Sequence, residues 1–340
     1  MLNDGACDVR PNVAPAGIVT FNVSNGAARH VTSVEVQRPD GLTLAQQANI
    51  APGESGTMVM QMAAGTYIIA CPGAGQPVSA FEVTSGGAWE RDPLLVQGAA
   101  TFRTSLQADA LSLGNAAKAL SNAIDIDDVG YAARAYRQAR VAFTSCSAFL
   151  EDGTGLVAKI NGPVDPFATR DSDLAGFPRV QAAIWRDHSL EGMRTVMDAL
   201  SSAINQASAA ATKAQPTPAD MLSAAVSSLS LATTARLSGE QEAYSGLTLI
   251  LVQADLDFAT TVYKDLRPAI VRRASQLAAA VEGRLASAST ALSALRASPG
   301  VEGSGYVEFA AVTPSQRHEL VQDFDALFAS LSFIDAQVLS

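Results

Sequence analysis

The hydrophobic period of this chain changes once, between about residues 85 and 99, and this change constrains the fold more than any other feature. Before it, apolar and polar residues alternate, most clearly in "GIVTFNVSN" at 17–25. A period of two places alternate side chains on opposite faces of a β-strand. Similar short runs are found, between turn-forming pairs such as Asn25-Gly26, at 32–41, 56–62, 65–71 and 79–85. Residues 1–86 are therefore predicted to form an all-β sandwich.

After the change, apolar residues recur every three to four positions, and alanine and leucine dominate. This period predicts amphipathic helices. They are expected at 99–123, 129–150, 179–211, 218–236, 243–264, 267–298 and 314–338, with Pro268 in the first turn of the helix over 267–298. Long helices with short polar breaks indicate an antiparallel all-α helical bundle over 99–340. A linker over 87–98 is expected to join it to the sandwich, which makes the chain a multidomain protein.

Composition limits the partners that such a chain can have. The 340 residues carry a net charge of −10, and their basic side chains are scattered, so no nucleic-acid partner is expected. No run of about 18 apolar residues is present, so no membrane span is expected. The first residues lack the pattern of a signal peptide, which leaves either a cytosolic protein or an exported one whose signal was removed. The oligomeric state stays open.

Cysteine placement offers a test of the compartment. Cys7 and Cys71 lie near the two ends of the β-rich segment, where they form either a disulfide or two buried thiols. A disulfide would stabilise the fold by about 4 kcal/mol in the loop-entropy model and would indicate an oxidising compartment. The third cysteine, Cys146, is expected to be a small buried hydrophobic residue.

Several ordered segments identify a family likeness. They are "ACDVRP" and "AGTYIIACPG" in the sandwich, and "YRQARVAF" at 136–143, "AGFPRVQAAIW" at 175–185, "LSGEQEAYSGLTLILVQADLDFA" at 237–259 and "GYVEFAAVTPSQRHEL" at 305–320. Together with the domain order, they resemble the EfeO-type family of periplasmic iron-uptake components. The resemblance implies a cupredoxin-like sandwich followed by an imelysin-like helical domain. It also implies a Cys7–Cys71 disulfide and a periplasmic or extracellular protein from which a signal or lipoprotein segment has been removed.

The sequence departs from this family where the family keeps its metal chemistry. Pro178 stands at the position of the family's signature histidine, and Gln181 at that of its signature glutamate. Two family carboxylates are also missing from the stretch 143–148, which holds Thr144 and Ser145 instead. Metal sites of this kind need imidazole or several converging carboxylates. We therefore expect no bound metal and no peptidase activity, with weak iron or copper binding left open.

The residues left at this degenerate site define the candidates for ligand contact. They are Gln181, Arg140, Thr144, Ser145, Glu240, Glu242, Tyr244 and Trp185. A glutamate pair beside an arginine is either a structural ion pair or the remnant of a metal site. Trp185 is either a ligand anchor or, since it matches a core position of the family, a packing residue.

The sandwich offers a separate copper hypothesis. Met58, Met60 and Met62 alternate, so they share one face of a strand. They form either a Cu(I) thioether patch or a packed methionine stripe. A blue-copper centre is excluded because the segment has one histidine, His30, and such a centre needs two.

Two functions follow from these patterns. In the first, the chain is an exported EfeO-like binding or accessory protein with a degenerate imelysin site, and the resemblance implies a membrane permease or a haem-peroxidase-like component as partner. In the second, the helical scaffold is a non-metal interaction or small-ligand-binding module. There, Gln181, Thr144 and Ser145 would offer hydrogen bonds to a small uncharged ligand.

Overall fold

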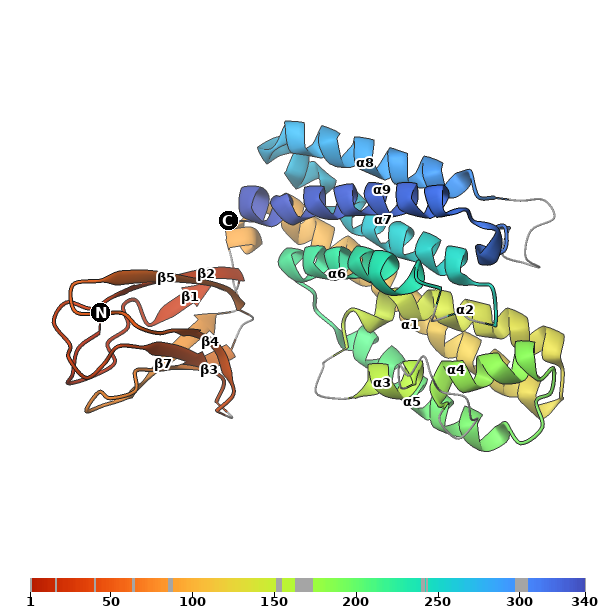
Figure 1. Ribbon diagram of the computed structural model, residues 1–340, viewed down its shortest axis with the longest axis horizontal. Helices are drawn as coiled ribbons and strands as arrows, with labels where there is room; N and C mark the ends of the chain where they lie inside the picture. The colour runs from red at the N-terminus through yellow and green to blue at the C-terminus, as the bar shows by residue number, and fades with distance from the viewer. Residues whose placement is uncertain are drawn as a thin grey trace. The chain divides into compact units, whose positions relative to one another are not determined.

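The chain folds into two compact units, Met1–Val96 together with Leu339–Ser340, and Gln97–Val338. A computed structural model describes residues 2–15, 17–39, 41–62, 65–84, 88–150, 155–162, 174–239, 242, 244–296 and 305–339. The first unit is built from strands and the second from helices (Figure 1). The predicted order of an all-β part followed by an all-α part is thus confirmed.

Two sheets form the first unit. The larger has the order β1 (Val13–Pro15), β7 (Val78–Thr84), β6 (Gly65–Ala70), β3 (Val34–Gln37) and β4 (Thr43–Gln47), with β1 and β7 parallel and the other pairs antiparallel. The smaller pairs β2 (Gly17–Ser24) with β5 (Ser55–Met62), and Val19 lies opposite Met60. The short strands β1 and β4 were not predicted, since three to five residues carry too little alternation to be recognised.

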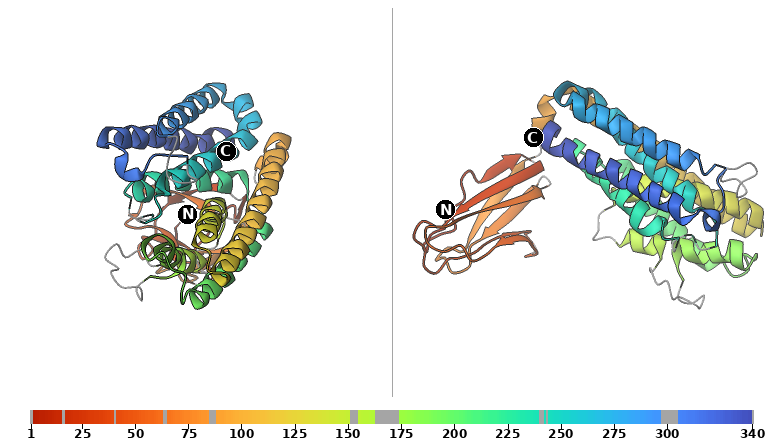
Figure 2. Two further views of the ribbon diagram at one scale, coloured as in Figure 1. Left: turned by 90° about the vertical axis from the view of Figure 1, so that its right-hand side faces the viewer. Right: turned by 45° about the horizontal axis from the view of Figure 1, so that its top comes forward.

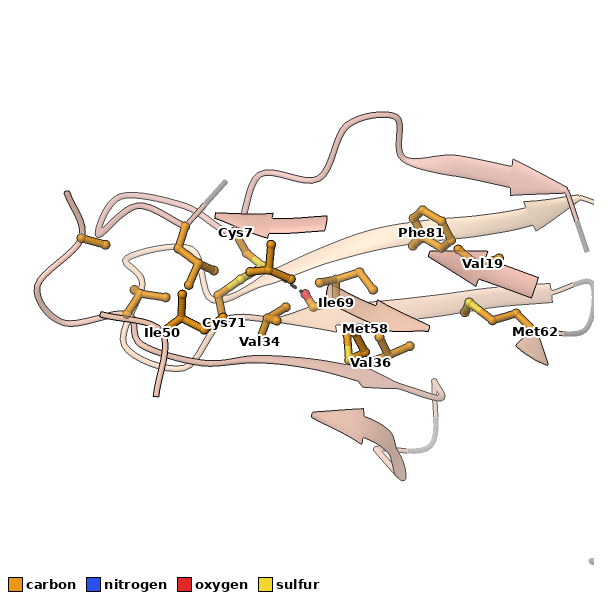
Figure 3. Close-up of a cluster of buried hydrophobic side chains, with 14 of the residues drawn as sticks. Cys7, Val19, Val34, Val36, Ile50, Met58, Met62, Ile69, Cys71 and Phe81 are labelled. Carbon is orange, nitrogen blue, oxygen red and sulfur yellow. Dashed lines mark hydrogen bonds between the residues drawn. A yellow bond between two sulfur atoms is a disulfide. The ribbon is translucent and has the colours of Figure 1, made fainter. Parts of the chain in front are cut away.

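The core of this unit lies between the sheets. Val19 from the smaller sheet and Ile69 and Phe81 from the larger one are buried there (Figure 3). Met58 and Met62 are buried in the same core, and Met60 packs against it, so the methionine stripe faces inward. The predicted disulfide joins Cys7 to Cys71, with the two Cα atoms 5.4 Å apart.

Nine α-helices are described in the second unit and its entry. They are α1 (Pro93–Asp125), α2 (Val129–Ser147), α3 (Leu156–Asn161), α4 (Gly176–Gln181), α5 (Arg194–Lys213), α6 (Pro218–Leu231), α7 (Thr248–Arg273), α8 (Ser275–Ser293) and α9 (Pro314–Ile334). Helices α4, α6 and α9 continue into π-helical turns at Ala182–Arg186, Ala232–Arg236 and Asp335–Leu339. Helices α6 to α9 pack side by side, and α3 and α4 pack on α5 (Figures 1 and 2). Within the described residues, we find no helix with the length and hydrophobicity needed to cross a bilayer.

Several expected helix boundaries were wrong, including that of the helix expected over 243–264, which is α7, Thr248–Arg273. The expected helix over 267–298 is divided at Ala274. Pro268 lies inside α7 at an exposed position, where water can solvate the backbone carbonyl that loses its N–H partner to the proline. The expected helix over 179–211 is interrupted between Arg186 and Arg194, where Gly192 has a φ of +72°. Residues 93–98 of the expected linker belong to α1, because the Asp92 side chain accepts a hydrogen bond from the Leu94 N–H (3.0 Å) at the helix start.

Candidate functional site

Helix α4 carries Pro178 and Gln181 and is fixed closely against its neighbours. Gly176 begins it with a φ of +58°, and a Cβ atom there would lie 2.2 Å from the Ile160 carbonyl oxygen of α3. The next residue, Phe177, is buried with its ring 5.4 Å from that of Tyr136 and 6.0 Å from that of Phe143, both on α2. This packing leaves Gln181 on the inner face of the helix, where it is 2% exposed.

Glu242 is the centre of the buried polar cluster that Gln181 joins. Its Oε2 accepts hydrogen bonds from the Gln181 amide and from the Ser245 hydroxyl. Its Oε1 accepts from Arg140 Nε at 2.8 Å, and this ion pair is almost completely buried. The Gln181 amide also reaches the Ser245 Oγ at 3.2 Å. Both carboxylate oxygens are therefore occupied by protein donors, as a buried charge requires.

Arg140 connects this cluster to helix α3 and also contacts helix α4. Its Nη1 donates to Asn161 Oδ1 at 2.9 Å, which brings in α3, and its guanidinium lies 5.0 Å from the centre of the Phe177 ring. Burial disfavours the guanidinium charge, but Glu242 and Tyr136 outweigh it, so the pKa of Arg140 is raised. Burial and the Glu242 charge raise the pKa of Tyr136 well above its ordinary value. The cluster is therefore a fixed ion pair with a neutral phenol beside it.

Two other predicted residues of α2 use their hydroxyls elsewhere. Thr144 is buried, but its Oγ1 donates to the Arg140 carbonyl one helical turn earlier (3.3 Å). Ser145 forms a hydrogen bond to Asp109 of α1. Burial raises the pKa of the Asp109 carboxyl, and this hydrogen bond offsets part of the rise. Ser145 comes five positions after Arg140, about 140° around the helix at 3.6 residues per turn, so its side chain starts from another face of α2.

The remaining predicted residues lie at the edge of the cluster. Pro178 is half-buried in the first turn of α4, and its side chain offers no donor or acceptor. The Trp185 ring is half-buried, 5.1 Å from that of Tyr136, which is a packing contact. Tyr244 is 41% exposed, and the Arg186 guanidinium lies 5.5 Å from the centre of its ring. Glu240 lies outside the described residues.

Sequence reasoning missed three members of the cluster. Tyr136 and Ser245 stand within the quoted family segments, so their positions beside Arg140 and Tyr244 were the available signal. Asn161 had no such signal, because it belongs to a helix of six residues, α3, that lies outside the quoted family segments. A helix of this length is too short to show a period of 3.6.

A second buried arginine–carboxylate pair lies in the same unit. Asp255, in the middle of α7, is fully buried and paired with Arg236 at the end of the π-helical turn after α6. Its Oδ1 also accepts from the Ser228 hydroxyl of α6 at 2.7 Å. Complete burial raises the pKa of the Asp255 carboxyl, while Arg236 and Ser228 act against the rise.

Across the part of the chain that the structure describes, no three His, Cys, Asp or Glu side chains gather closely enough to hold a metal ion. Burial raises the pKa of the Cys146 thiol to about 12, so it is protonated at neutral pH and behaves as the predicted buried hydrophobic residue. What the Glu242 cluster can do is hold α2, α3, α4 and the segment before α7 together.

This helical unit is that of a known family. The sequence profile of the imelysin family, Peptidase_M75, matches residues 98–334, and the chain belongs to this family. Over 340 residues, the chain is 23% identical to the iron uptake system component EfeO of Escherichia coli O1:K1, with 97% of this chain and 88% of that protein covered. It is 22% identical, with the same shares covered, to the iron uptake system component EfeO of Yersinia pseudotuberculosis serotype I.

Proposed function

We propose that this chain is an exported, EfeO-like accessory protein of an iron-uptake-type system whose imelysin site is a structural cluster and not a metal centre. The observation that carries the proposal is the state of Glu242. Its two oxygens are taken by Arg140 on one side and by Gln181 and Ser245 on the other. The family likeness supports the class of system, and this geometry supports the loss of metal chemistry.

Electrostatics explains why the cluster would reject a cation. A divalent ion at Glu242 would have to displace a guanidinium bound at 2.8 Å or share the carboxylate with it. Displacement leaves the buried Arg140 guanidinium without its carboxylate partner, which costs about 2 kcal/mol. Sharing places two positive charges close together inside the protein. Gln181 would add one neutral oxygen in place of a second anionic ligand.

Localisation and partners belong to the same proposal. The Cys7–Cys71 disulfide supports an oxidising compartment, as expected for a periplasmic or extracellular protein. The relatives are named as components of an iron uptake system. A permease or a haem-peroxidase-like component of such a system is the partner class that we propose, with recognition through the protein surface and without hydrolysis.

Metal titration of the whole chain tests the proposal directly. Calorimetry with Fe(II), Fe(III), Cu(II) and Zn(II) should show no site with a dissociation constant below about 100 µM. Glu242→Gln and Glu240→Ala should give the same heats as the unchanged chain. Micromolar iron binding that either substitution abolishes would overturn the proposal.

A restored signature provides the complementary test. The double substitution Pro178→His and Gln181→Glu returns an imidazole and a carboxylate to the cluster, and Zn(II) or Fe(II) binding should then become measurable. The matched control, Pro178→Ala with Gln181→Asn, changes the same positions without adding a metal ligand and should bind no metal. Equal binding by the unchanged chain and the restored variant would contradict the assignment of these two positions.

A further inference from the structure

The sandwich contains a cavity, partly open to solvent and lined mostly by apolar groups, that the iron-uptake proposal does not use. Its volume is about 260 Å³. Side chains from both sheets line it, among them Val19, Phe21, Val23, Val34, Ile69 and Phe81.

Strand topology explains why the sandwich is open at this place. Strands β1 and β2 are neighbours in sequence, but β1 is the edge of the larger sheet and β2 belongs to the smaller one. The segment before β1 is tied down at both ends, by the Cys7–Cys71 disulfide and by a hydrogen bond from the Glu82 N–H to the Asn12 carbonyl (2.9 Å). Between these ties it passes over the cavity and contributes Asp8, Val9 and Arg10 to the lining.

The cavity walls favour an aromatic group. The Phe21 and Phe81 rings, one from each sheet, lie 5.0 Å apart with their planes tilted by 57°. Phe81 is 3% exposed, whereas Phe21 stays partly exposed between its buried neighbours Val19 and Val23. A partly exposed ring beside an apolar void offers a surface on which another ring can stack. An apolar cavity of roughly 150 Å³ is enough to hold benzene.

Charge at the rim favours a neutral molecule. Asp8 and Arg10 pair with each other at 3.1 Å, so together they add no net charge. The other polar residues of the lining, Thr20 and Asn22, are uncharged and exposed, and their side chains alternate with the inward-facing Val19, Phe21 and Val23. The interior therefore has no partner for a buried charge.

We infer that the sandwich binds a small uncharged aromatic molecule, of one or two rings, in the cavity between β1, β2 and the Phe21–Phe81 pair. This site lies wholly within the first unit and is independent of the Glu242 cluster. It gives the sandwich a binding role separate from metal chemistry.

Fluorescence of 1-naphthylamine, an uncharged two-ring probe, tests this inference with the full chain. Saturable enhancement with a blue shift is expected, with a dissociation constant below about 100 µM. Ala14→Phe places a ring in the cavity from β1 and should weaken binding at least about tenfold. The matched control is Ala45→Phe, since Ala45 is also half-buried against this core but is not part of the cavity lining. It should leave binding unchanged.

Several outcomes would overturn the inference. They are absence of saturable binding, equal binding by Ala14→Phe and the unchanged chain, and equally tight binding of 1-naphthalenesulfonate, its charged counterpart. Stronger displacement by 1-octanol than by 2-naphthol would replace the aromatic ligand class by an aliphatic one. If Ala14→Phe does not fold, amide chemical shifts of the unchanged chain decide the matter. Shifts induced by 2-naphthol must centre on residues 8–23 and 81, and a centre elsewhere refutes the site.

Discussion

The two buried arginine–carboxylate pairs of the helical unit look alike in chemistry but are built differently. Arg236 and Asp255 join α7 to the turn that follows α6, and Ser228 of α6 completes the group. Arg140 and Glu242 join α2 to the segment before α7, with contacts to α3 and α4. The acid of the first pair is fully buried inside a helix, whereas Glu242 is 5% exposed and lies outside the regular helices.

This difference separates two uses of a buried charge. The Asp255 pair is made by two consecutive helices, so it is a packing device that a chain can keep regardless of function. The Glu242 pair, by contrast, gathers residues from four segments, among them Gln181 of α4. Its side chains converge on one point, and their hydrogen-bond donors and acceptors satisfy each other. Comparing the stability effects of the Arg236–Asp255 and Arg140–Glu242 pairs therefore tests whether the second pair has only a structural role.

The largest effect is expected from Asp255→Ala. This substitution leaves the Arg236 guanidinium, 5% exposed, without the carboxylate that it binds through two nitrogen atoms. The free energy of unfolding should fall by about 3–5 kcal/mol, as measured by urea denaturation followed by circular dichroism. Asp257→Ala is the control on the same helix, because Asp257 is exposed and bonded only within one helical turn, to Gln253. If the free energy of unfolding falls as little in Asp255→Ala as in the control, Asp255 has no structural role.

A smaller effect is expected from Glu242→Ala, at about 2 kcal/mol. Arg140 keeps its hydrogen bond to Asn161 and its position over the Phe177 ring, so its charge is left only partly uncompensated. Urea denaturation of Glu242→Ala, Arg140→Met and the double variant gives the coupling energy. The double variant should be more stable than the sum of the single losses predicts. Additive losses would show that Arg140 and Glu242 do not depend on each other.

The smallest effect is expected from a carboxylate on α7 whose buried oxygen has no partner. Asp265 Oδ2 is buried without a hydrogen bond, and burial raises the pKa of this carboxyl. Because the pKa of this carboxyl is higher in the folded protein than in the unfolded chain, its protonated form favours folding. This contribution to stability is complete below about 3.9, the ordinary pKa of an aspartate, and is lost as the pH rises through the folded-state pKa. Asp265→Asn should abolish this decline, as measured by unfolding at a series of pH values from 3.5 to 7. An unchanged pH profile would contradict the assignment.

The sequence predicted the frame of the molecule better than the details of the site. The change of period located both architectures, because repeated burial of one face leaves a clear pattern over many residues. The family resemblance, and not the period, singled out Gln181, Arg140 and Glu242, since all three stand in family segments. It also left the ion-pair interpretation open, and the 2.8 Å contact between Arg140 and Glu242 is such a pair.

What the sequence could not provide were contacts made by short or irregular segments. Asn161 reaches Arg140 from a six-residue helix, and nothing in its neighbours marks it. The order of the family segments predicts that Ser145 lies near Gln181. The direction of the Ser145 side chain depends instead on its position around helix α2. The preference of proline for the first turn predicts a helix start at Pro268. The residue lies instead within α7, because an exposed proline can be accommodated in a helix whose other face is well packed.

Gly176 has a consequence for how chains of this kind can be found in genomes. No side chain fits at this position while α3 and α4 keep their approach, since a Cβ atom would overlap the Ile160 carbonyl oxygen. That restriction is steric, so it holds whatever residues stand at positions 178 and 181. A search pattern that requires a histidine and a glutamate at these two positions overlooks this chain, which has Pro178 and Gln181 there. A pattern anchored on the glycine and the aromatic residue after it would retain it.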